Sequence, residues 1–387
     1  MRKFLLALLV LAVISLVIFF SVPRIVDERM NALLNPAPYD ASAAAKAMHS
    51  RLFIADLHDD VLLWQRDILE RHDYGHSDLP RLQEGNVNLQ VFSTVTKTPK
   101  GLNYERNGAD SDSLTLLLMA QRWPTETWNS LLARALYQSA RLHRAEAASQ
   151  GQLRIIRSQA DLTNLLRQPK QQPHTVAAVL ATEGLHPLEG KLENIDKLYD
   201  AGFRITGLTH FFDNEVGGSA HGIEKGGLTD FGRQVIQRLE QKSMLVDLAH
   251  ASKPLIDDVL AISTQPVVVS HTGVAGTCPG PRNLTDQHLK AIAATGGIVG
   301  IGYWDGAVCD PSINNIIKAI RYSADLVGVE HVALGSDYDG ATSVPFDTTG
   351  LVQITQGLLD AGFSEQEIAA IMGGNIRDLL LKTLPQS

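Results

Sequence analysis

Two histidines stand at the ends of short apolar runs within residues 244–273. The first run, MLVDLAH, ends at His250, and the second, PVVVSHTG, contains His271. The segment between them has apolar residues at helical spacing, so the stretch predicts a strand, a helix and a second, parallel strand. Neighbouring parallel strands end at the same edge of a sheet, about 4.8 Å apart. The two imidazoles could therefore share one metal ion; two separately hydrogen-bonded histidines are the alternative.

Ionisable side chains follow most of the other predicted strands as well. The strand ends together carry His58, Asp60, Glu183, His210, His250, His271 and Asp337. His58 and Asp60 are two residues apart, so an extended backbone points both side chains to the same side. An imidazole and a carboxylate suit zinc, although a capping aspartate beside an unrelated histidine has the same spacing. Three histidines and two carboxylates exceed the needs of one tetrahedral ion. We therefore expect two ions that share one carboxylate, and Glu183 is the expected bridge because its strand lies between the other ligands.

Two further residues are suited to act on a substrate. Asp337 directly follows the eighth predicted strand and is the candidate for proton transfer. Asp339 lies two residues further on and is expected to cap the following turn. His210 could donate a hydrogen bond to an oxyanion, and a histidine packed at a strand end is the alternative.

The elements that must position these side chains alternate between strands and helices. The predicted strands are Phe53–Leu57, Val87–Phe92, Thr175–Ala181, Phe203–Leu208, a strand from Leu245, Pro266–Ser270, Gly297–Trp304 and His331–Gly335. The predicted helices include residues 111–150 with a break at Pro124, a short helix capped by Asp161, Asn194–Asp200, Asp230–Gln241, Asn314–Leu326 and a last long helix with a Ser364–Glu367 capping box. This alternation predicts an α/β fold, an eight-stranded β/α (TIM-type) barrel with additional helices over residues 51–387. An open, doubly wound sheet is the rival. The glycines at 297, 300 and 302 lie inside a strand, so we interpret them as structural rather than as a nucleotide-binding loop.

The charge and the N-terminus restrict the class of protein. A net charge of −8 argues against nucleic acid as a partner. Two cysteines are too few for a disulfide framework or a Cys-rich zinc module. Arg2 and Lys3 precede an apolar run to Val22 that is long enough to span a bilayer, with its basic end in the cytoplasm. We expect residues 1–22 to be an N-terminal signal anchor that adds nothing to the fold, with a cleaved signal peptide as the alternative. Residues 23–50 are expected to be a tether followed by a helix.

A set of short motifs runs in a fixed order over residues 52–380. The motifs are IADLHDD, SDLPRLQEGNVNLQVFS, ATEGLHPLEG, RITGLTH, GGLTDFGRQVIQRL, LVDLAHAS, PVVVSHTGVAGTCPGPRNLTD, ALGSDYDG and IMGGNIRDLL. Through them the chain resembles the renal (membrane) dipeptidase family, zinc-dependent dipeptidases of the amidohydrolase-like barrel group. Where that family commonly has Gly-His-Asn-Asp-Leu-Pro, this chain has Leu57-His58-Asp59-Asp60-Val61-Leu62. The expected metal ligands His58 and Asp60 are retained in this stretch. Their neighbours differ, so the stretch does not predict which dipeptides the enzyme prefers.

The resemblance implies a dipeptidase that uses two zinc ions per chain. A hydroxide that bridges the ions would attack the peptide carbonyl of a dipeptide. The implied roles are His58, Asp60 and Glu183 on one ion; Glu183, His250 and His271 on the other; His210 polarising the carbonyl; Asp337 handling the proton; and Arg282 binding the C-terminal carboxylate of the substrate. The family also suggests a homodimer.

The chain ends also indicate where the protein is located in the cell, and two other functions remain as alternatives. Mammalian members attach through a C-terminal lipid signal, whereas this chain ends in Leu384-Pro385-Gln386-Ser387. We therefore expect a single-pass protein of the bacterial inner membrane with its catalytic domain in the periplasm, or an exported enzyme if the segment is cleaved. A lactonase or phosphotriesterase-like dinuclear hydrolase is one rival, but those enzymes commonly begin with His-x-His and bridge through a modified lysine. A non-catalytic envelope binding protein on the same barrel is the other.

Cys278 and Cys309 each lie in a loop after a neighbouring predicted strand, at the same edge of the barrel. In an exported protein this placement predicts a disulfide, with two free thiols as the alternative. Arg282 shares the loop of Cys278 and can reach the barrel mouth. A surface arginine that braces Asp286 or another acidic residue of the loop is its alternative role.

Overall fold

Eight parallel strands close into a barrel in the computed structural model of the chain, which describes residues 2–168 and 173–387. The barrel strands are β1 (Ile54–Asp59), β2 (Val87–Phe92), β4 (Val176–Thr182), β5 (Phe203–Gly207), β6 (Leu245–Asp247), β7 (Val268–Thr272), β8 (Ile298–Ile301) and β9 (Val332–Leu334). Each strand pairs with the next along the chain, β9 pairs with β1, and β2 pairs directly with β4, so the sheet has no open end. The predicted TIM-type barrel is confirmed, and the open doubly wound sheet is excluded.

A ninth strand, β3 (Leu153–Ile155), was not predicted. It pairs in parallel with the beginning of β4, where Leu153 lies opposite Val176, and takes no place in the closed ring. Its three residues alternate between buried and exposed side chains. So short a run carries too little apolar periodicity to be distinguished from a loop.

The barrel strands are buried because both of their faces are covered. One face points into the barrel, where Ala55, Leu57, Leu89, Val91, Ala177, Val179, Ile205, Leu245, Val268, Ile298 and Ala333 form one apolar cluster that continues into α15 (Asn375–Thr383). The other face packs against the surrounding helices. In β8, a Cβ at Gly300 would collide with the carbonyl oxygen of Ser270 on β7. This close approach of two backbones supports the structural interpretation of the glycines.

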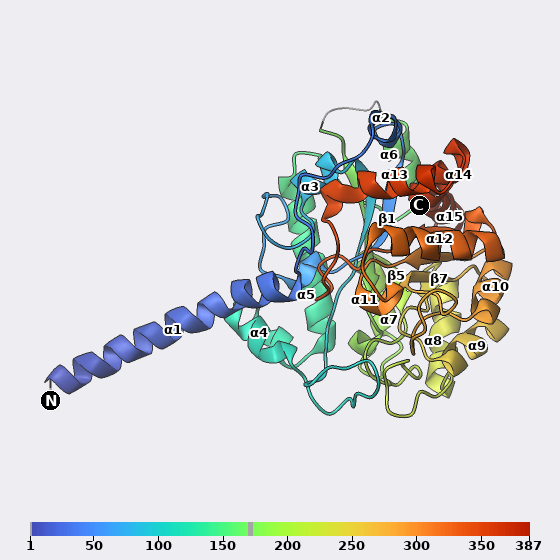
Figure 1. The fold of residues 1–387 in the computed structure, drawn as a ribbon. Helices are drawn as coiled ribbons and strands as arrows, with labels where there is room; N and C mark the ends of the chain where they lie inside the picture. The colour runs from blue at the N-terminus through green and yellow to red at the C-terminus, as the bar shows by residue number, and fades with distance from the viewer. Residues whose placement is uncertain (1, 169–172) are drawn as a thin grey trace.

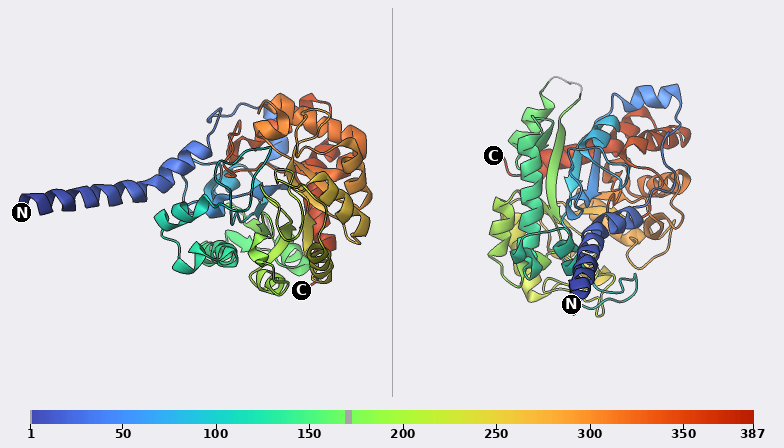
Figure 2. Two further views of the ribbon diagram at one scale, coloured as in Figure 1. Left: turned by 90° about the horizontal axis from the view of Figure 1, so that it is seen from below. Right: turned by 90° about the vertical axis from the view of Figure 1, so that its left-hand side faces the viewer.

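Helices surround the barrel. Those before the third barrel strand are α1 (Arg2–Met30), α2 (Ala43–His49), α3 (Leu79–Glu84), α4 (Leu114–Ala120), α5 (Leu131–Ala148) and α6 (Gln159–Leu166). The later ones are α7 (Asn194–Asp200), α8 (Asp230–Gln241), α9 (Lys253–Ile262), α10 (Asp286–Ala294), α11 (Asp305–Val308), α12 (Ile313–Val327), α13 (Val352–Asp360), α14 (Glu365–Ala369) and α15. Most of them form the outer layer of the barrel, and α1 projects away from it (Figures 1 and 2).

Two predicted helix boundaries need correction. Helix α6 is capped by Ser158, whose hydroxyl accepts the backbone N–H of Asp161, so Asp161 lies inside the first turn. The capping box of Ser364 and Glu367 is present. The helix that it begins is interrupted by a π-turn, Ala370–Gly374, because a Cβ at Gly373 would collide with the backbone of β1.

Helix α1 is long and apolar enough to cross a membrane, with 29 residues and a mean hydropathy of 3.1 in its most apolar window. An N-terminal signal sequence has the same two properties. The helix runs past Val22 to Met30, and its last turns pack beside α4. After it, Leu33 pairs with Val344, and the N–H of Leu34 donates to the carbonyl of Val344. Residues 23–35, expected to be the start of a tether, are therefore held against the barrel.

Candidate active site

The seven residues predicted at strand ends meet at the carboxyl end of the barrel, and all are buried. His58 is in β1 and Asp60 follows it; Glu183 follows β4; His210 and His250 lie just beyond β5 and β6; His271 is in β7; and Asp337 lies just beyond β9. Parallel strands in a barrel all end on one side, which explains why residues so far apart in the chain converge.

Glu183 is at the centre of the cluster. Its Oε1 lies 3.0 Å from Nε2 of His250 and 3.5 Å from Nε2 of His271. The same oxygen lies 3.5 Å from Nε2 of His58. The other oxygen, Oε2, lies 3.3 Å from Nε2 of His210. One carboxylate thus faces imidazole nitrogens from four strands.

The donor atoms fit metal ions. Nε2 of His250 and Nε2 of His271 are 3.0 Å apart, and Nε2 of His58 lies 3.4 Å from Oδ2 of Asp60. Within the described residues, His58 Nε2 and Asp60 Oδ1 are buried without a hydrogen-bond partner. The hydroxyl of Ser270 lies 2.9 Å from Nδ1 of His271 and 3.3 Å from Nδ1 of His58. If both Nδ1 atoms donate to this oxygen, both Nε2 atoms keep a free lone pair for a cation.

Three overlapping groups of side chains are close enough to hold an ion: His58, Glu183 and His271; Glu183, His210 and His250; and His58, Asp60 and Asp337. Glu183 belongs to two of them, as a bridging ligand should. His210 and Asp337, which were expected to act on the substrate, also lie within reach of the ion positions. The geometry places them at the reacting centre without distinguishing ligands from acid–base groups.

The electrostatics follow from burial of many ionisable groups together. Burial raises the pKa of Glu183 well above its usual range, and the charge of Asp60 adds to this shift. Burial likewise raises the pKa of Asp337 to about 7, against the opposing effect of His58. Burial opposes the charging of His58, but the surrounding carboxylates raise its pKa to about 10. A bound cation would instead hold the carboxylates ionised and the imidazoles neutral.

Two site residues have left-handed backbones, which side chains other than glycine rarely adopt. The φ angle is 61° at both His250 and Asp337. Such conformations cost of order 1–3 kcal/mol each and occur most often at functional sites. Both residues stand just beyond a barrel strand, where the left-handed turn redirects the chain as it leaves the sheet.

Arg282 lies beside the cluster, in the loop after β7. Its Nη2 donates to the carbonyl of His271 at 2.7 Å, and its guanidinium carbon lies 4.9 Å from the ring centre of Trp304. Within the described part of the chain, the Nε of Arg282 is buried and has no partner. Asp286 accepts a hydrogen bond from the hydroxyl of Tyr322 at 2.7 Å. The alternative role of Arg282 as a brace for Asp286 is therefore unsupported.

The loop of Arg282 is joined to the loop after β8. The sulfur atoms of Cys278 and Cys309 are 2.08 Å apart, within a disulfide. The side-chain amide of Asn283 adds hydrogen bonds to the carbonyls of Cys278 and Gly306 on the two sides of this connection.

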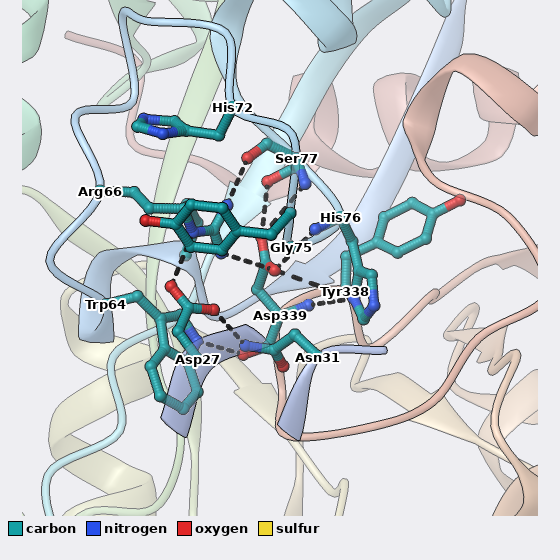
Figure 3. Close-up of polar contacts among 12 residues, drawn as sticks. Asp27, Asn31, Trp64, Arg66, His72, Gly75, His76, Ser77, Tyr338 and Asp339 are labelled. Atoms are coloured by element: carbon teal, nitrogen blue, oxygen red, sulfur yellow. Dashed lines mark hydrogen bonds and ion pairs between the residues drawn. The ribbon is translucent and has the colours of Figure 1, made fainter. Parts of the chain in front are cut away.

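One functional element was missed from the sequence, and Figure 3 shows it. Asp339 does not cap its own turn; its carboxylate accepts the N–H of His76 at 2.8 Å and the N–H of Ser77 at 3.2 Å. It also pairs with Nη2 of Arg66 at 2.6 Å, and Nε of Arg66 pairs with Asp27 of α1 at 2.8 Å. The Asp337-x-Asp339 spacing was a signal for a site, but no local pattern marks Arg66 or Asp27 as its partners.

Comparison with known proteins shows the family and agrees with the fold. The model of the membrane dipeptidase family (peptidase family M19) matches residues 42–382. The dipeptidase aclJ of Aspergillus oryzae is 26% identical over 382 residues, which cover 90% of this chain and 84% of that protein. The probable dipeptidase PvdM from Pseudomonas aeruginosa superposes with a TM-score of 0.73 at 18% identity, over 89% of this chain and 98% of that one. A metallo peptidase from Rhodobacter sphaeroides, liganded with a phosphinate mimic of the dipeptide L-Ala-D-Ala, superposes with a TM-score of 0.69 at 24% identity, over 86% and 99% of the two chains. The chain belongs to the membrane dipeptidase family, and it is a metallo-dipeptidase.

Proposed function

We propose that the enzyme uses two zinc ions to hydrolyse dipeptides. The proposed ligands are His58, Asp60 and Glu183 for one ion, and Glu183, His250 and His271 for the other. The observation that carries this proposal is the position of Glu183, whose Oε1 lies 3.0–3.5 Å from the Nε2 atoms of three histidines. Imidazole and carboxylate ligands without thiolates suit zinc, and sharing one carboxylate is the usual way to bring two ions together.

When bound, zinc supplies a Lewis acid for the peptide carbonyl and lowers the pKa of water to near neutrality. The chain's own residues then supply proton transfer and orientation. The carboxylate of Asp337 lies 4.0 Å from Nε2 of the proposed ligand His58, so it is placed to accept a proton at the reacting centre and to return it. It takes the proton that the attacking water loses and gives it to the peptide nitrogen. The C–N bond breaks, and the products are a free acid and a free amine.

His210 is placed to stabilise the oxyanion. Burial lowers the pKa of His210 well below its usual range, and the neighbouring His186, His221 and Arg282 add to the shift, so the ring is neutral. A neutral imidazole carries one N–H, which it can donate to the carbonyl oxygen as negative charge develops there.

Arg282 is the proposed site for the C-terminal carboxylate of the substrate. Its guanidinium is held at the end of β7 by the carbonyl of His271, and its Nε has no hydrogen-bond partner among residues 2–168 and 173–387. A guanidinium presents a planar pair of donors that matches a carboxylate, and lysine does not reproduce that geometry. This role would explain a restriction to dipeptides, because the carboxylate must lie one residue from the scissile bond.

The deciding experiment compares a dipeptide with its C-terminal amide, using zinc-loaded enzyme. We expect the dipeptide to be cleaved about ten- to hundredfold better in kcat/KM, the equivalent of about 1.5–3 kcal/mol for a hydrogen bond to a charged group. Arg282→Ala should erase this difference while zinc content, measured by elemental analysis, stays the same. Equal cleavage of both substrates by the unmodified enzyme would refute the carboxylate role and weaken the proposed dipeptide specificity.

We also propose that residues 1–22 anchor the enzyme in the bacterial inner membrane, with the catalytic domain in the periplasm. Residues 2–22 of α1 are roughly 32 Å long at 1.5 Å per residue, which matches the ~30 Å hydrocarbon core of a bilayer. Arg2 and Lys3 at one end favour a cytoplasmic N-terminus. Membrane fractions should contain the full-length chain. A soluble mature form that begins near residue 23 would mean that the segment is cleaved.

A further inference from the structure

A cavity of about 510 Å³ opens next to the proposed zinc ligands. One end is polar and is lined by Asp60, Glu183 and His210. The rest of the wall is mostly apolar, with Thr98, Ser113 and Asp339 as its polar members, and comes from α1, α4 and the loops after the strands. The apolar wall residues are Phe19, Val22, Val26 and Met30 of α1; Leu114, Leu116, Leu117 and Ala120 of α4; and Leu63, Trp64, Val95, Leu102 and Phe211 of the loops. Catalysis at the polar end uses none of these apolar side chains.

Helix α1 contributes one face to this wall. Its four wall residues are spaced three or four positions apart, which is the spacing of a single helix face. Ile25 is not among the residues that line the cavity, although its exposure of 47% is similar to the 44% of the wall residue Met30. The helix that carries the membrane anchor is therefore also a side of the cavity that opens onto the catalytic residues.

A buried set of polar contacts holds α1 in this place (Figure 3). Asp27 pairs with Arg66, which pairs in turn with Asp339, two residues from the proposed proton carrier Asp337. Asn31 donates from its amide to Asp27 at 2.8 Å and accepts the N–H of Ala341 at 2.9 Å. The position of the α1 wall is thus coupled to the loop after β9, which borders both the cavity and the reacting centre.

The orientation of a bound dipeptide indicates what the cavity holds. Within the part of the chain that the structure describes, the wall includes Asp60, Glu183 and His210 but neither Arg282 nor Trp304. If Arg282 holds the C-terminal carboxylate, the other end of the dipeptide points into the apolar cavity. Its volume falls in the range of small-molecule sites, which is more than a methyl group requires.

We propose that the α1–α4 cavity is the subsite for the N-terminal side chain of the substrate, and that it selects dipeptides with a large apolar N-terminal residue. This inference rests on the proposed function, because it takes Arg282 to fix the other end of the dipeptide. Residues 19–30 of α1 are then specificity-determining residues as well as the end of an anchor.

The test uses the full-length enzyme in lipid nanodiscs and a series of dipeptides, Gly-Ala, Ala-Ala, Leu-Ala and Phe-Ala. We expect kcat/KM to rise about ten- to hundredfold from Gly-Ala to Leu-Ala or Phe-Ala, as a filled apolar pocket discriminates by such factors. Val26→Trp should fill the cavity from α1 and lower the Leu-Ala to Gly-Ala ratio at least tenfold. Leu117→Trp should do the same from the α4 side, which guards against a local effect on α1. Ile25→Trp is the matched control and should keep the parental ratio.

The outcomes separate this inference from the proposed function. Cleavage of every dipeptide at a similar rate by the parent, or a ratio that both tryptophan variants leave unchanged, would overturn the subsite and leave the cavity to another apolar occupant such as a lipid chain. No cleavage of any dipeptide by the zinc-loaded parent would instead contradict the proposed function. A lowered ratio in both wall variants, with the control unchanged, supports the subsite.

Discussion

Replacing Arg66 with methionine tests whether the buried polar contacts join α1 to the catalytic loop. The Arg66 side chain is 1% exposed and lies between the carboxylates of Asp27 and Asp339, which are 2% and 0% exposed. Its Nη1 also donates to the carbonyl of Ser77 at 2.9 Å. Methionine has a similar length but no donor, so Arg66→Met leaves two buried carboxylates without their cation.

The expected loss of stability follows from the hydrogen-bond donors that each carboxylate keeps in the variant. Asp339 retains donors from His76 and Ser77, whereas among the described residues the side chain of Asp27 retains only the amide of Asn31 as a donor. Removing one partner of a buried ion pair costs about 3–5 kcal/mol. Asp27→Asn should cost less, about 1.5–3 kcal/mol, because Arg66 keeps its pairing with Asp339 and only one charged hydrogen bond weakens. With an unfolding entropy of about 2.1 cal/mol/K per residue over 387 residues, these losses lower Tm by about 4–6 °C and 2–4 °C respectively.

The assay is thermal unfolding of the full-length enzyme at fixed zinc and lipid content, together with kcat/KM for one good dipeptide. The double variant Arg66→Met/Asp27→Asn should be more stable than Arg66→Met alone, because it removes one of the unpaired carboxylates. Activity should fall with Arg66→Met, since the loop that carries Asp337 loses its support. Equal Tm values for Arg66→Met and the parent would refute this reasoning. A double variant that is no more stable than Arg66→Met alone would refute it as well.

Three further predictions concern the metal, the proton carrier and a remote histidine. Glu183→Ala should lower zinc content from near two ions per chain to at most one by elemental analysis, and full retention would rule out the bridge. Asp337→Asn should lower kcat about 10²- to 10⁴-fold with zinc retained; loss of zinc together with activity would make Asp337 a ligand instead. Burial lowers the pKa of His49 from 6.5 to about 4. Between these two pH values His49 is therefore protonated in the unfolded chain but stays neutral in the folded chain. The unfolding free energy should therefore decrease by up to about 3 kcal/mol as pH falls from 6.5 to 4, and His49→Gln should remove that part of the pH dependence when compared with the parent at equal zinc content.

The barrel and the central cluster could be predicted because their signals are local. Each barrel strand is a short apolar run, and the ionisable residue follows it within a few positions, as His250 follows β6 and Glu183 follows β4. Parallel pairing then brings all strand ends to one side without any further information. The ionisable residues could therefore be assigned to one site without any knowledge of long-range contacts.

The contacts of α1 could not be predicted in this way. The pairing of Leu33 with Val344 and the ion pair of Arg66 with Asp339 join segments that are hundreds of residues apart and show no periodic pattern. The apolar run to Val22 predicted the anchor by its length, and the residues after it were expected to begin a tether. In the structure the helix continues to Met30, because Asp27 and the following Asn31 are buried and form polar contacts there. The partners of Asp339 were hidden for the same reason.

The closing of the barrel between β1 and β9 has a consequence for biosynthesis. Asp56 of β1 lies opposite Leu334 of β9, and its carboxylate accepts the N–H of Ser336 at 2.9 Å, across 280 residues of chain. A growing polypeptide that has emerged as far as β8 already contains all five proposed zinc ligands. It nevertheless has two open sheet edges, which invite pairing with other chains until the last strand arrives.

Because a metal site of this kind is formed by folding, stable loading of the proposed zinc ions must wait until β9 has paired with β1. Slow, non-local strand pairing lengthens that interval. Ions or chaperones that bind the chain earlier therefore encounter ligands that are not yet assembled into a site. The segment after β8 determines when the enzyme becomes active.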